Sequence, residues 1–198
     1  MQVRIKIDFI ILLLVFVVGF FVIKNVHTVG DYFWSFTHKP STEMINIANG
    51  AGMNDTGKRL FLRLSPSLAD QDSIKQLCGD KKLGCTVGRN IYILKNTNET
   101  EFNTTIVTAA HEMLHVAYSR LSSTEKDRLA SLIDAELQRT DANKIKDKLS
   151  GYPAEDYYNE AHSYIGSELS NISPDLEQYY AKYFYNRSKS TQAYNNSP

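Results

Sequence analysis

Residues 104–121 read TTIVTAAHEMLHVAYSRL, and the rest of the chain has to be built around this stretch. Thr104 or Thr105 can cap the N-terminus of a helix that continues to the end of the stretch. At about 100° per residue, its aliphatic side chains share one face, which we expect to enter the core. His111 and His115 lie on the opposite side of the helix. The sequence therefore predicts a half-buried helix whose two histidines face a cleft.

The histidines belong to the pattern His-Glu-x-x-His, in which Glu112 directly follows the first of them. Residues four apart lie one above the other on a helix, so both imidazoles can bind one metal ion. The intervening glutamate then stands beside an open coordination position. In such a site Glu112 is the catalytic general base, which takes a proton from metal-activated water for the hydrolysis of an amide bond. The alternative is an accidental or structural occurrence of the motif, with the histidines packed in the core.

Residues 157–164, YYNEAHSY, form a second candidate segment on a later helix. Together with His-Glu-x-x-His, this segment resembles the thermolysin-like gluzincins, a group of zincin metallopeptidases whose second metal helix has the pattern N-E-x-x-S-D. Asn159, Glu160 and Ser163 match that pattern, whereas Tyr164 stands in place of its aspartate. A different carboxylate would then have to orient the first histidine. The resemblance covers two helices only, and the segment between them is longer than in thermolysin.

The resemblance implies a zinc ion bound by His111, His115 and Glu160, since catalytic zinc sites usually have three protein ligands and a water. His162 is the rival third ligand, because some zincins use a third histidine. Glu160 and His162 are about 200° apart on a regular helix, so they cannot both reach one metal ion. Two other carboxylates remain as further alternatives, Glu168 and Glu136.

Two tyrosines on the helical face of Glu160 are candidates for a second catalytic role, Tyr157 and Tyr164. Either hydroxyl could donate a hydrogen bond to the oxyanion of a tetrahedral intermediate, as a tyrosine or histidine does in related peptidases. Packing between helices is the alternative role, because most of the tyrosines in this half of the chain are explained by it.

An uncharged run of fifteen residues, 9–23, lies close to the N-terminus. We interpret residues 9–26 as a transmembrane signal anchor, because flanking lysines can extend to the membrane surface. Arg4 and Lys6 before the run predict a cytoplasmic N-terminus at residues 1–8 and an extracytoplasmic catalytic domain, in a single-pass membrane protein. A cleaved signal peptide is the alternative, although no Ala-x-Ala-like site follows the run.

Charge and cysteine content exclude several classes of protein. The 198 residues include 22 Lys and Arg and 22 Asp and Glu, so the basic surplus of a nucleic-acid-binding protein is missing and we expect no nucleic-acid partner. Two cysteines are too few for a Cys-rich zinc module, so a metal site must use histidines and carboxylates. Cys78 and Cys85 can close a small disulfide loop in an oxidising compartment, or remain two reduced thiols.

The chain between the anchor and the histidine motif predicts a stalk followed by a small sheet. The stalk, residues 27–57, is polar and rich in turn residues. Strand-like runs at 59–64 and 90–94 flank a short helix at about 69–78.

After residue 103 the signals are helical throughout. Ser122 to Glu125 form a capping box, and further helices are expected near Pro153 and after Ser173-Pro174. The predicted fold class is α+β and zincin-like: a small N-terminal sheet, the active-site helix and a helical C-terminal half, preceded by one transmembrane helix. Residues 58–198 are expected to form the zinc metallopeptidase domain.

These features predict a membrane-anchored zinc metallopeptidase whose partner is a peptide or protein substrate. An extended substrate is expected to lie antiparallel to the strand that ends at Leu94. The stretches 91–94 and 107–118 also resemble small membrane-anchored candidate zinc peptidases among uncharacterised bacterial sequences. A cell-wall amide or peptide hydrolase is one alternative. A catalytically inactive, membrane-tethered interaction domain with a structural metal is another.

Overall fold

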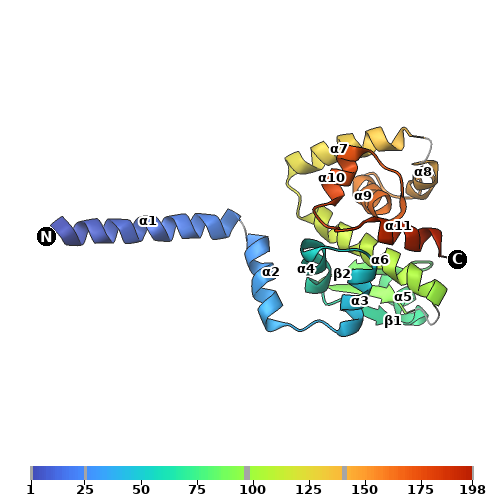
Figure 1. Cartoon of the computed structure of the whole chain (residues 1–198), viewed down its shortest axis with the longest axis horizontal. Helices are drawn as coiled ribbons and strands as arrows, with labels where there is room; N and C mark the ends of the chain where they lie inside the picture. Colours follow the sequence, from blue (N-terminus) through green and yellow to red (C-terminus); the bar gives the residue numbers. More distant parts are fainter. Residues whose placement is uncertain (1, 25, 96–98, 140–141, 198) are drawn as a thin grey trace. The chain divides into compact units, whose positions relative to one another are not determined.

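The computed structural model describes residues 2–24, 26–95, 99–139 and 142–197, and it divides the chain into two compact units, Met1–Lys39 and Pro40–Pro198 (Figure 1). In the described residues the protein is mostly helical, with one small sheet of three strands. The expected α+β fold class is therefore wrong, because much of the region before the histidine motif is helical as well.

The N-terminal unit consists of two helices, α1 (Gln2–Lys24) and α2 (Val26–Thr37). No helix in the described ranges is both long and apolar enough to cross a membrane. The expected transmembrane anchor is therefore wrong, and so is the predicted topology of a single-pass membrane protein.

The physical reason is the length of the apolar run. Fifteen uncharged helical residues, 9–23, reach only about 22 Å, whereas the hydrocarbon core of a bilayer is about 30 Å thick. A longer reach, such as residues 7–26, has to include the charged residues Asp8 and Lys24.

The second unit begins with a helix, α3 (Thr42–Gly50), in a region expected to belong to a stalk. Ser41 caps this helix by accepting a hydrogen bond from the backbone N–H of Met44. Its buried side chains Met44, Ile47 and Ala48 belong to the hydrophobic core. The turn-rich composition of residues 40–57 therefore marks helix ends inside the folded unit.

The next helix, α4 (Asp55–Arg63), replaces the strand expected at 59–64. Asn54 caps it by accepting hydrogen bonds from the N–H groups of Thr56 and Gly57. Its adjacent apolar residues fit one buried face of a short helix as well as they fit a strand, so the apolar pattern alone could not distinguish the two.

The sheet has the strand order β1-β3-β2, from β1 (Ser67–Ala69), β2 (Gly84–Val87) and β3 (Asn90–Leu94). β1 runs parallel to β3, and β2 runs antiparallel to it. The predicted strand at 90–94 is confirmed, and its Ile91 and Ile93 are fully buried. β3 is the central strand, so the free edge of the sheet near the histidine helix is β2.

The predicted short helix is confirmed as α5 (Gln71–Cys78), which ends at the first cysteine. A disulfide joins Cys78 to Cys85 on β2, with a Cα–Cα distance of 5.5 Å. The expected disulfide loop is thus confirmed. It ties the end of α5 and the following loop to the edge strand.

Helix α6 (Glu99–Ser119) carries the His-Glu-x-x-His motif and lies at the centre of the second unit. It packs against the sheet, α3 and α4 on one side and against α9 and α11 on the other (Figure 1). This central position explains why both the apolar residue Met113 and the neighbouring Leu114 are fully buried.

The described residues after α6 form five helices. The predicted capping box is confirmed: Ser122 accepts from the N–H of Glu125, and the Glu125 side chain accepts from the N–H of Ser122. The helix expected near Pro153 begins four residues later. The bounds of these helices are α7 (Ser123–Leu137), α8 (Asn143–Leu149), α9 (Tyr157–Glu168), α10 (Pro174–Tyr180) and α11 (Ser188–Asn195).

A glycine allows α9 to approach α6 closely. A Cβ atom built on Gly166 of α9 would lie 2.5 Å from Leu114 Cδ1 of α6 and 2.6 Å from Tyr180 Cε1. Leu114 and Tyr180 are fully buried, so neither side chain can turn toward solvent. The two helices can therefore lie this close only because residue 166 is a glycine.

We expect Gly166→Ala to lower the free energy of unfolding by about 1–2 kcal/mol. Overpacking in a filled core costs about 1–3 kcal/mol, and the better helix propensity of alanine returns at most about 1 kcal/mol. Urea denaturation measures the difference. Gly151→Ala is the matched control, because a Cβ atom there has no neighbour within 4 Å; equal stability of the two variants would contradict the close packing.

Candidate metal centre

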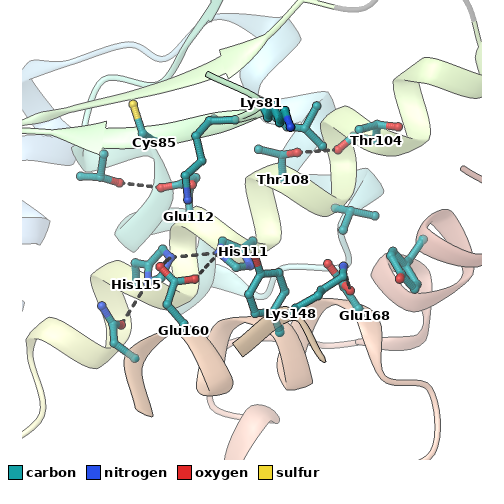
Figure 2. A pocket seen from close by; sticks show the side chains of 18 of the residues that line it. Lys81, Cys85, Thr104, Thr108, His111, Glu112, His115, Lys148, Glu160 and Glu168 are labelled. Carbon is teal, nitrogen blue, oxygen red and sulfur yellow. Dashed lines mark hydrogen bonds and ion pairs between the residues drawn. The ribbon is translucent and has the colours of Figure 1, made fainter. Parts of the chain in front are cut away.

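Helices α6 and α9 bring three potential ligands together. The Nε2 atoms of His111 and His115 lie 3.0 Å apart. The carboxylate of Glu160 on α9 approaches both of them, with Oε2 3.5 Å from His111 Nε2 and Oε1 3.6 Å from His115 Nε2. Figure 2 shows these three side chains turned toward one another. The two imidazoles are therefore not buried in the hydrophobic core but converge with an acidic group.

Residues of α9 fix the orientation of His115. Its Nδ1 lies 3.0 Å from Asn159 Oδ1 and 3.2 Å from Ser163 Oγ. Because the amide oxygen only accepts hydrogen bonds, Nδ1 carries the proton and Nε2 keeps its lone pair for a metal ion. Burial lowers the pKa of His115, and the neighbouring His111 lowers it further, which favours the neutral, ligating form.

The carboxylate of Glu160 is suited to bind a cation. Its Oε2 is buried and has no hydrogen-bond partner among the described residues. Burial raises the pKa of Glu160, but contacts with His111 and His115 and the charge of Lys82 outweigh burial and leave the pKa below its ordinary value. A buried, ionised oxygen whose nearest polar neighbour is an imidazole nitrogen at 3.5 Å is costly, and a metal ion beside it would compensate the charge.

Glu112 lies beside these groups but has a different partner. It is buried, and its Oε2 accepts a hydrogen bond of 2.9 Å from the hydroxyl of Thr86 on β2. One ligand atom each of His111, Glu112 and His115 lies within 4.8 Å of the others, so this His-Glu-His cluster could hold a metal ion. Glu112 thus has a hydrogen-bond donor in Thr86, whereas Oε2 of Glu160 has none among the described residues.

These residues line a cavity of about 530 Å³. Its walls are formed by α6, by α9, by edge strand β2 with its preceding loop, by the end of α8 with the turn that follows it, and by the C-terminal end of α11. Clefts of this size are typical of small-molecule or peptide sites. A metal ion at the histidines would therefore be accessible to a substrate.

His162, the rival third ligand, lies outside this cluster. Its ring is fully buried among the rings of Tyr118, Tyr179 and Tyr180, with centroid distances of 5.8, 5.5 and 5.4 Å. Burial, followed by the charges of His115 and His111, lowers its pKa to about 3. Both ring nitrogens lack a hydrogen-bond partner within the described ranges. Glu160 and His162 lie on different faces of α9, so Glu160 faces the cavity and His162 lies in the core.

The two other acidic alternatives also have partners of their own. Glu168 lines the cavity but is paired with Lys148, whose Nζ lies 2.6 Å from its Oε2. Glu136 is buried, accepts a hydrogen bond of 2.8 Å from the backbone N–H of Ser173, and forms an ion pair with Arg139. Neither carboxylate is placed beside the two histidines.

The structure separates the two candidate tyrosines. Tyr164 lines the cavity, its ring lies edge-on to that of His111 at 4.6 Å, and its hydroxyl is 3.0 Å from that of Tyr152. Tyr164 thus packs against the first histidine, where the resemblance expects a carboxylate. Tyr157 instead packs against Tyr158 and is not part of the cavity lining. Of these two tyrosines, Tyr164 is the one that lines the cavity.

Sequence reasoning missed most of the polar residues that line the cavity, among them Thr86, Lys82 and Tyr152. All three lie in short turns or on an edge strand with no hydrophobic periodicity. The one sequence signal that could have pointed to the first two is the cysteine pair, because Lys82 lies inside the loop that the disulfide closes and Thr86 directly follows it.

We expect Glu160→Gln to weaken the binding of a divalent metal by at least about tenfold, because it removes a charged ligand. His162→Phe is expected to leave metal affinity unchanged, and not to lower stability, because the ring nitrogens it removes are buried without partners. Competition titrations with Co²⁺ measure both affinities. The opposite ranking of the two variants would identify His162 as the third ligand.

The chain was compared with protein-family models, with curated proteins and with solved structures, and no match was found. The resemblance to the gluzincins therefore stays a prediction.

Proposed function

We propose that this protein is a zinc-dependent metallopeptidase, which hydrolyses peptide bonds in the cavity between α6, α9 and β2. One observation carries the proposal. The two imidazole Nε2 atoms and the Glu160 carboxylate converge within 3.6 Å of one another, in an open cavity that also contains the buried Glu112.

The donor set supports zinc as the metal. Two imidazole nitrogens and one carboxylate form a ligand set of catalytic zinc, which leaves a further position for water or substrate. A zinc ion bound there would supply a water of pKa about 7 and would polarise a substrate carbonyl. A structural zinc site would normally be closed by a fourth protein ligand, and the open cavity argues against that role.

Glu112 is assigned the role of general base. It accepts the proton of the attacking water and delivers it to the leaving amine, so no covalent intermediate with the protein is needed. The hydroxyl of Thr86 holds one carboxylate oxygen and leaves the other for this proton transfer. A purely structural metal site gives no reason for a buried glutamate in this place.

Tyr164 is assigned the stabilisation of the developing oxyanion. Burial, and the hydrogen bond with Tyr152, raise the pKa of Tyr164, so its hydroxyl stays protonated and can donate. Its contact with the His111 ring supports a position next to the metal centre.

The substrate strand is assigned to β2. Backbone pairing with an exposed edge is a common way to bind an extended peptide. The strand that ends at Leu94 was expected to serve as this edge, but it is central in the sheet and has neighbours on both sides. Gly84 and Thr86 of β2 line the cavity, which supports the edge strand as the docking site.

We expect Glu112→Gln to retain zinc and to lose peptide hydrolysis by a factor of about 10² to 10⁴, because the amide cannot accept the proton. The rate is measured with a fluorogenic peptide library before and after chelation, and zinc content is measured on the same samples. Gln138→Glu at the C-cap of α7, which changes charge outside the cavity lining, is the control and should retain activity. Unchanged peptide hydrolysis by Glu112→Gln would contradict the role of Glu112 as general base.

A further inference from the structure

A short loop with two lysines forms one wall of the cavity. Lys81 and Lys82 lie between α5 and β2, inside the loop that the disulfide closes, and both line the cavity. The backbone of Lys81 has a φ of 64°, in the left-handed region. The disulfide and the turn together limit the backbone conformations of this loop, so the positions of its Cα atoms at the cavity wall are restricted.

A hydrogen-bond chain connects Lys82 to Tyr164, whose ring contacts the first histidine of the candidate metal centre. Lys82 Nζ donates to Tyr152 Oη at 3.1 Å, and Tyr152 Oη lies 3.0 Å from Tyr164 Oη. The ring of Tyr164 packs against His111. An ammonium group has three N–H donors, and this chain uses one of them. Lys82 is therefore held on the cavity wall with donors left for a ligand.

The charges of the cavity favour an anion beside the metal. Three lysines, Lys81, Lys82 and Lys148, and three glutamates, Glu112, Glu160 and Glu168, line it. Lys148 and Glu168 form an ion pair and balance each other. Two glutamates then balance a divalent metal ion, and the positive charges of the loop remain. A ligand with a negative charge would complement this wall.

We propose that Lys82 binds a carboxylate of the substrate, so that the cavity selects peptides with a negative charge next to the scissile bond. The inference rests on the proposed metallopeptidase function and defines its substrate class. Tyr152 acts as a positioning residue for Lys82. The group that Lys82 recognises is a carboxylate of the substrate, which can belong to a free C-terminus or to an acidic side chain.

The test measures peptide binding without turnover, in the zinc-loaded full chain with Glu112→Gln. Three probes are compared by calorimetry: N-acetyl-Ala-Ala-Ala as the free acid, the same peptide as its C-terminal amide, and N-acetyl-Ala-Glu-Ala amide. We expect at least one carboxylate probe to bind about tenfold more tightly than the neutral amide, as a charged hydrogen bond allows. The better of the two carboxylate probes identifies the source of the charge.

Adding Lys82→Gln should abolish this preference, and Lys82→Arg should retain most of it. Lys189→Gln is the matched control, because it removes another Lys–Tyr hydrogen bond, with Tyr185, outside the cavity lining. Zinc content should be equal in all variants. Equal binding of the three probes would overturn the proposal. A preference for carboxylate probes that survives Lys82→Gln would overturn it as well, because the metal itself would then bind the carboxylate.

This experiment separates the two proposals. If the parent protein hydrolyses no peptide but the preference for a carboxylate depends on Lys82, the metallopeptidase function fails and the carboxylate site stands. If peptides are hydrolysed with no such preference, the substrate class fails and the peptidase function stands.

Discussion

The close contact between α6 and α9 is the constraint on which the site depends. Gly166 lets the helices approach until Leu114 and Tyr180 fill the space where a side chain would be. The same approach brings Asn159 and Ser163 to the ring of His115 and brings Glu160 to both histidines. One helix interface thus packs the core and also brings the three candidate ligands together. The side chains of the two histidines would therefore change little on binding a metal ion.

The parts of the site that could be predicted are those encoded by helical periodicity. The spacing of His111, Glu112 and His115 follows from the helix repeat, and the apolar residues between them fix which face enters the core. The same reasoning separated Glu160 from His162, since residues two apart cannot share one face. Strand β3, α5, the capping box of α7 and the disulfide were also predictable, because each has a strong local signal.

The remainder depends on contacts that are distant in sequence. α3 and α4 were missed because their turn residues cap helices within the folded unit. Which strand forms the sheet edge depends on pairing order, and β2 has too little apolar patterning to be predicted at all. The apolar N-terminal run was over-interpreted, because composition suggested a membrane span that its length does not support. Thr86, Lys82 and Tyr152 reach the cavity only through the tertiary fold.

Helix α9 shows how one short segment can serve both the core and the site. Its Glu160 faces the polar cavity, whereas His162, two residues later, is enclosed by tyrosine rings, and neither of its nitrogens has a hydrogen-bond partner in the part of the chain that the structure describes. A histidine in that place adds no ligand, and its pKa of about 3 keeps it neutral at any pH at which the site could bind a metal. Because the ring stays uncharged, it would not compete with a bound cation for the negative charge of Glu160. The burial of His162 is therefore compatible with the metal centre on the opposite face of the same helix.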